Sequence, residues 1–171
     1  MTTTEISKER AFINAVWQRI EGNRGAIATV SRCTDSDPYY QRQAATYIYP
    51  YLPDDIRQWQ KKINRYVFVA ALMAKNHQQN PKDAQIGSSF GHTCLRLKKH
   101  ANVNANGIEN RFQALLNANG EDVYRYLGMF APLLRQHNIP CEWAKLLEDL
   151  NCWDHEEEKV RLRWARDFYQ D

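Results

Sequence analysis

Apolar residues recur at helical spacing along almost the whole chain, and no segment shows the apolar-polar alternation of a half-buried β-strand. The first stretch, FINAVWQRI, is apolar at i, i+1, i+4, i+5 and i+8 and is closely followed by Gly22, a residue common after a helix end. A chain of 171 residues fits one domain or two small ones. The sequence predicts an all-helical bundle of about seven to nine helices, as a single domain or as two helical halves divided near residues 76–88.

Capping and breaking residues place the individual helices. Pro53 and Asp54 open a long helical segment, and Ser88 or Ser89 caps the helix that begins near Phe90. The polar stretch ANVNANG, residues 101–107, predicts a loop before a short helix over 108–116. Three further helices are expected, within residues 121–138, 141–153 and 156–169. Pro132 introduces a kink in the first of them.

Large apolar residues on the periodic faces should form the core, because these faces are where helices pack. The predicted buried set is Phe12, Trp17, Trp59, Phe112, Leu116, Leu127, Leu147, Trp153, Trp164 and Phe168.

Charge is distributed unevenly, although 23 cations against 20 anions leave a formal net charge of only +3. Residues 57–99 hold nine cations and one anion, whereas residues 142–158 hold seven anions and one cation. Arg57, Lys61 and Arg65 share one helical stripe, where like charges cost about 0.2 to 0.5 kcal/mol per pair unless an anion binds. The distribution fits a face that binds a polyanion, and it also fits a solvated mixed surface.

Cysteine usage and hydropathy indicate the cellular compartment. The four cysteines contain no CxxC pair, and the polar start MTTTEISKER is unlike a signal peptide, so we expect reduced thiols in a cytoplasmic protein. The longest apolar run, VFVAALMA, is far shorter than the ~20 residues of a membrane span, so no membrane partner is expected.

No motif indicates an enzyme, a metal site or a cofactor. The five histidines form no HxxxH or HExxH pair, and GxxxxGK[ST] and GxGxxG are absent. Ser88, Ser89 and His92 could supply a nucleophile and a base, but a helix cap followed by a surface histidine is the commoner arrangement. The glutamates at 156–158 could form an acidic site, but acidic residues at a helix start ordinarily interact with the helix dipole.

A group of tyrosines allows two interpretations. Tyr39, Tyr40, Tyr47, Tyr49 and Tyr51 fall within YYQRQAATYIYPYL, which fits a half-buried amphipathic helix. The same rings could form a platform on which nucleic-acid bases stack.

Six segments resemble the CasB family, the small subunit of the type I-E CRISPR surveillance complex called Cascade. They occur in the order and spacing of that family, and the C-terminal half of the chain carries the most specific of them. One departure is that Ser31 and Arg32 stand where the family often has two adjacent arginines, which leaves Arg32 alone there. The segments are FINAVWQRIEGNRGAIATVSR, YVFVAALMAKNH, IGSSFGHTCLRLKKH, IENRFQALLNANGEDVYRYL, IPCEWAKLLEDLNCWD and VRLRWARDFY.

The resemblance implies an all-helical, non-enzymatic antiviral defence protein that works in a crRNA-guided assembly. It implies that two copies pack head to tail beside other Cascade subunits, near crRNA and target DNA, and help to hold the displaced non-target strand. Sequence would then be read by guide pairing and not by this chain. A basic track for phosphates is predicted from Arg32, Arg57, Lys61, Arg65, Arg96, Lys98, Lys99, Arg111 and Arg161.

Two other functions fit parts of the sequence. A helical adaptor could use the same basic face for an acidic protein partner, and a hydrolase could use the glutamates at 156–158, although no base or metal partner accompanies them. Within the track, Arg111 could instead pair with Glu109, or with a glutamate elsewhere, as a structural bridge.

Overall fold

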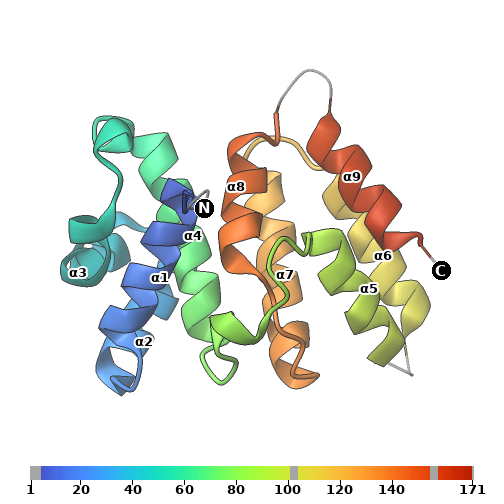
Figure 1. Cartoon of the computed structure of the whole chain (residues 1–171), viewed down its shortest axis with the longest axis horizontal. Helices are drawn as coiled ribbons and strands as arrows, with labels where there is room; N and C mark the ends of the chain where they lie inside the picture. Colours follow the sequence, from blue (N-terminus) through green and yellow to red (C-terminus); the bar gives the residue numbers. More distant parts are fainter. Residues whose placement is uncertain (1–4, 101–103, 155–157, 171) are drawn as a thin grey trace.

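The computed structural model describes residues 5–100, 104–154 and 158–170, and within them the chain is helical without any β-strand, which confirms the predicted fold class (Figure 1). Four short 3-10 turns lie at 32–34, 49–51, 54–56 and 81–83. The described α-helices are α1 (Lys8–Ile20), α2 (Arg24–Ser31), α3 (Pro38–Ile48), α4 (Gln60–Lys75), α5 (Phe90–His100), α6 (Ala105–Leu116), α7 (Asp122–Gln136), α8 (Trp143–Asn151) and α9 (Lys159–Phe168).

Helix α8 lies in the middle of the arrangement and joins helices from both ends of the chain (Figure 1). On one side it packs against α1 and α4, which also contact α2 and α3. On the other side of the molecule α5 packs against α9 and α6, and α6 contacts α7. Residues 76–89 carry the chain from the first group of helices to the second. The division of the domain in this segment remains a prediction.

Side-chain caps set several helix starts. Ser89 Oγ accepts a hydrogen bond from the His92 backbone N–H at 3.3 Å, so the predicted serine cap of α5 is confirmed at Ser89. Asn104 caps α6 in the same way, accepting from the Gly107 N–H at 3.0 Å. Because of this cap, α6 begins at Ala105, and the predicted loop over 101–107 is wrong for residues 105–107. Residues 101–103 lie outside the described residues.

Aromatic rings fill the space between α5, α7 and α9. Trp164 is fully buried, with its ring centroid 4.9 Å from that of Trp153 and 5.5 Å from that of Phe90. At Gly91 the backbones approach so closely that a Cβ atom would lie 2.3 Å from the Trp164 carbonyl oxygen. Only glycine leaves room for this contact, so any side chain at Gly91 would push α5 away from α9.

Eight of the ten predicted core residues are buried, and two differ. Leu116 is only half-buried. Trp59 is 54% exposed, so its predicted burial is wrong. The prediction assumed one helix from Pro53 onward, but residues 54–56 form a 3-10 turn and α4 begins only at Gln60. Trp59 therefore precedes the helix, with extended backbone at φ −115° and ψ 94°.

A polar seam joins α1 to α8. The Arg10 guanidinium donates two hydrogen bonds to the Glu142 carboxylate, at 2.9 and 2.8 Å, and this bonding raises the pKa of Arg10. The Glu142 side chain is only 4% exposed, and it also accepts from the Gly87 backbone N–H at 3.1 Å. Ser7 and Glu9 of the N-terminal region bond to Glu148 and Asn151 of α8. The seam thus fixes α1, α8 and the segment before α5 together.

We expect Arg10→Ala to lower the free energy of unfolding by about 2 to 4 kcal/mol, because it leaves the buried Glu142 carboxylate without its main partner. Lys8→Ala is the matched control, since the 2.7 Å bridge from Lys8 to Asp55 joins two exposed side chains and should matter little. Urea unfolding measures both. Equal midpoints for the two variants would contradict this assignment of the seam.

Candidate nucleic-acid interface

Two of the nine predicted phosphate-binding cations are built into the packing of the helices. Arg65 on α4 donates to the Tyr124 hydroxyl at 3.3 Å and to Asn151 Oδ1 at 3.0 Å, so it joins α4 to α7 and α8. Arg161 donates to the Leu116 carbonyl and to Asn119 Oδ1, both at 2.9 Å, and its side chain is only 12% exposed. Both guanidinium groups are therefore occupied by internal acceptors.

Three more of the nine have local partners. Arg57 donates to the Leu52 carbonyl at 3.0 Å and lies 3.2 Å from the Asp54 carboxylate. Arg96 donates to Ser88 Oγ at 2.6 Å. Lys98 lies 3.6 Å from Glu109 of α6 and 5.4 Å from the centre of the Phe168 ring. Each retains a charge that an added phosphate could share, but each is also held by the fold.

Four of the nine have neither an ion pair nor a side-chain hydrogen bond among the described residues: Arg32, Lys61, Lys99 and Arg111. The structural alternative for Arg111 is not what the fold adopts, because Glu109 pairs with Lys98 instead. Lys61 is on α4 and Lys99 on α5, and α7 and α8 lie between these helices (Figure 1). That all nine cations form one continuous surface remains a prediction.

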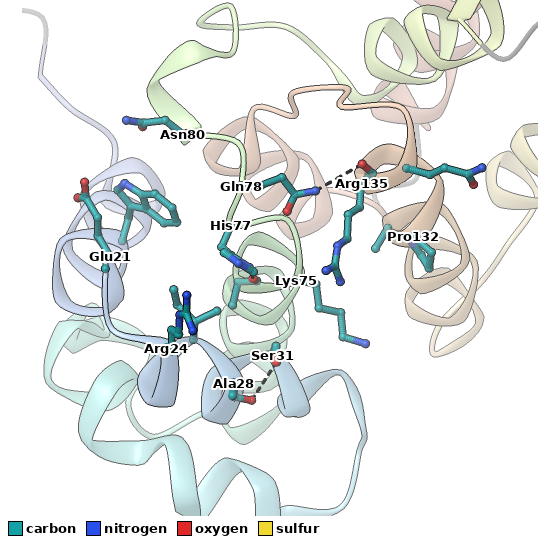
Figure 2. A pocket seen from close by; sticks show the side chains of 16 residues that line it. Glu21, Arg24, Ala28, Ser31, Lys75, His77, Gln78, Asn80, Pro132 and Arg135 are labelled. Carbon is teal, nitrogen blue, oxygen red and sulfur yellow. Dashed lines mark hydrogen bonds between the residues drawn. The ribbon is translucent and has the colours of Figure 1, made fainter.

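A groove of about 1450 Å³ gathers three further cations that the sequence analysis did not select (Figure 2). Arg24 begins α2, Lys75 ends α4 and Arg135 lies in the last turn of α7. All three side chains are exposed, and none has an ion-pair partner in the described part of the chain. Glu21 is the single acidic residue among those that line the groove, so the groove carries net positive charge.

The three groove cations differ in their position relative to the helix dipoles. Lys75 and Arg135 lie at helix C-termini, where a cation offsets the negative end of the helix dipole and so has a structural reason to be there. Arg24 lies in the first turn of α2, where the dipole disfavours a cation. Arg24 takes part in no ion pair within the described chain, and an external anion in the groove would offset its charge.

The walls of the groove offer hydrogen-bonding groups as well as charge. Figure 2 shows His77 and Gln78 on the segment that follows α4, between the cations. Gln78 Nε2 donates to the Arg135 carbonyl at 3.4 Å, which ties this segment to α7. Trp17 and Ile27 supply apolar wall. Charge, amides and apolar surface together suit a phosphate backbone with its sugars.

A smaller hollow of about 320 Å³ brings Arg32 together with Tyr39 and Tyr40. Tyr39 is 50% exposed, and its ring packs edge-on against Tyr40 at 5.4 Å. Tyr40, Tyr47, Tyr49 and Tyr51 are all partly buried against the core, as expected of an amphipathic helix and the turn after it. A role of the exposed Tyr39 ring in base stacking remains a prediction.

The SSFGH segment serves to connect helices. Ser89 is buried and donates to Asp167 Oδ2 at 2.7 Å, and His92 Nε2 lies 3.7 Å from the same carboxylate. Ser88 accepts from Arg96. These contacts join α5 to α9 and leave Ser89 without access to a substrate. Within the described residues no cluster of three potential ligands could hold a metal ion, and no helix is long and apolar enough to cross a membrane. Glu156 and Glu157 lie outside the described residues.

Comparison with known proteins supplies the family. The sequence profile of the CRISPR-associated protein Cse2 family matches residues 26–169. The chain belongs to the Cse2 family. A CRISPR-associated protein Cse2 from Thermus thermophilus is 30% identical over 156 residues, covering 89% of this chain and 85% of the relative.

Solved structures of Cse2 proteins share the fold. A crystal structure of a Cse2-family protein from Thermus thermophilus superposes with a TM-score of 0.75 at 27% identity, covering 96% of this chain and 99% of that one. The crystal structure of M. ruber CasB superposes with a TM-score of 0.74 at 27% identity, covering 96% of this chain and 94% of that one. The CasB resemblance seen in the sequence is thereby confirmed. A chain of a CRISPR RNA-guided surveillance complex shares the fold, with a TM-score of 0.73 at 22% identity. The superposition covers 95% of this chain and 91% of that one.

We expect the cations of this Cse2 protein to separate into structural and free groups on substitution. Arg161→Ala should lower the free energy of unfolding by about 1 to 3 kcal/mol, since it leaves the Leu116 carbonyl and Asn119 without their donors. Lys99→Ala, on an exposed side chain, should stay within about 0.5 kcal/mol of the parent. Urea unfolding checks both values, and equal losses would show that burial does not distinguish the two groups.

Proposed function

We propose that this Cse2-family chain is the non-catalytic small subunit of a crRNA-guided type I-E CRISPR surveillance complex in the cytoplasm. In that complex its basic surface holds nucleic-acid backbone, above all the displaced non-target DNA strand. Its partners are crRNA, target and non-target DNA, other Cascade subunits and a second copy of itself, packed head to tail. Family membership and the CasB relatives support this placement.

The observation that carries the proposal is the groove of Figure 2, with Arg24, Lys75 and Arg135 unpaired and one acid opposing them. Unpaired cations that converge in a hollow attract a polyanion more strongly than the same cations scattered on a convex face. Four unpaired cations of the sequence prediction lie outside this groove and could also attract a polyanion: Arg32, Lys61, Lys99 and Arg111.

Holding the displaced strand needs no chemistry on this chain. Opening DNA against a guide RNA exchanges one duplex for another of similar stability, so the process is nearly balanced. A few phosphate contacts to the displaced strand, each releasing counterions, then shift the balance toward the open state. Phosphate contacts carry no base information, so the effect should be the same for every sequence.

The test compares the complex assembled with and without this chain. Omission should weaken retention of the displaced strand evenly across target sequences, measured by gel shift with a label on that strand. The double variant Arg24→Ala, Arg135→Ala should weaken retention of the strand by a smaller amount. It should also make the dependence of log K on log salt shallower by about 0.7 for each lost contact. Lys75 is left in place so that one groove cation remains.

A charge-matched control uses Arg125→Ala with Arg166→Ala, which removes two exposed cations outside the groove. This control should retain the strand like the parent complex. The groove variant could also retain the strand like the parent complex, with an unchanged salt slope. That result would favour the rival adaptor function, in which the basic surface binds an acidic protein. Loss of complex assembly in the groove variant alone would favour the same rival.

A further inference from the structure

Trp59 has an environment unlike that of the other tryptophans. Trp17, Trp143, Trp153 and Trp164 are buried, whereas Trp59 is 54% exposed at the residue before α4. Leaving a large aromatic ring in water forgoes the stabilisation that burial would bring. The fold itself gains little from a tryptophan at this position.

The surroundings of the ring are cationic and polar. Lys62 Nζ lies over the Trp59 ring, 5.5 Å from its centre, and Lys61 is exposed without a partner in the described chain. The first turn of α4 contains no acidic residue. The acids of the preceding turn are matched by other cations, Asp55 by Lys8 at 2.7 Å and Asp54 by Arg57 at 3.2 Å. Lys62 also attracts the Asp55 carboxylate, so Lys61 is the cation of this pair that has no partner in the described chain.

We propose that Trp59 is a stacking platform for an unpaired base of single-stranded nucleic acid, with Lys61 and Lys62 binding the flanking phosphates. An exposed indole beside exposed ammonium groups is the combination that binds single strands without reading their sequence. A base on the accessible part of the ring also leaves the Lys62 ammonium free to pair with its phosphate. The inference rests on the proposed function, because it assumes that the chain meets a displaced strand.

A protein partner fits this surface less well. Aromatic residues that anchor protein interfaces lie in patches from which charge is depleted. Here the sequence neighbours Gln58, Gln60, Lys61 and Lys62 are all exposed and polar, so they add no apolar surface to the ring. Gln60 also belongs to an amide cluster, donating to Gln41 Oε1 at 3.0 Å and to Asn64 Oδ1 at 2.8 Å. This amide cluster makes the surface at the start of α4 polar where it faces α3.

The experiment compares two probes of equal length and charge, an oligo(dT) and an abasic oligomer, on the purified full chain. The parent should bind oligo(dT) more tightly than the abasic strand. Trp59→Ala should lose about 5-fold or more in affinity for oligo(dT) and nothing for the abasic strand. Trp59→Phe should recover part of the loss, because a smaller ring still stacks. Lys61→Ala with Lys62→Ala should weaken both probes alike.

Each contrary outcome identifies which idea is wrong. If the parent binds both probes equally and Trp59→Ala changes neither, the platform is wrong while backbone binding stands. If the parent binds neither probe, and omitting the chain from the assembled complex also leaves retention unchanged, the proposed function fails and the platform with it. If Trp59→Ala leaves oligo(dT) binding intact but prevents assembly of the complex, the ring anchors a protein partner and the platform is overturned.

Discussion

Two buried carboxylates on α8 and at its start hold the helices of this protein together. Glu142 is bonded to Arg10 of α1 and to the Gly87 backbone, while Asp149 accepts from the Trp164 indole N–H at 2.8 Å and pairs with Arg163. A carboxylate this far from water is tolerable only with charged or hydrogen-bonded partners. The partners of Glu142 come from distant parts of the chain, and those of Asp149 come from the next helix, α9. Satisfying these two charges therefore fixes where α1 and α9 lie against α8.

The groove depends on the packing around α4. Its cations come from α2, α4 and α7, and their distances from one another depend on how α2 and α7 pack against α4. Arg65 strengthens that packing by bonding to Tyr124 of α7 and Asn151 of α8. A cation that looks from the sequence like a phosphate ligand therefore helps to build the surface on which other cations act.

The sequence predicted the helices and most of the core because both follow from periodicity, which is a local property. It could not separate structural from free cations, since Arg65 and Lys61 occupy the same stripe and differ only in what packs against them. Nor could it show which acids of the run at 142–158 are exposed, since Glu142 and Asp149 are buried. Arg24 and Arg135 are 111 positions apart in sequence, so only the tertiary fold could bring them to one groove.

The groove and the Trp59 surface lie at opposite ends of α4, whose 16 residues span about 24 Å. That separation exceeds the screening length of about 8 to 10 Å at physiological salt, so the two groups of cations do not assist each other through the field alone. A flexible strand that reaches both would still link them, because binding at one end raises the effective concentration of the strand at the other. Under the proposed function, weak contacts at both ends would together hold a displaced strand. The buried middle of α4, where Phe68 packs against Tyr124 of α7, keeps the two ends at a fixed distance.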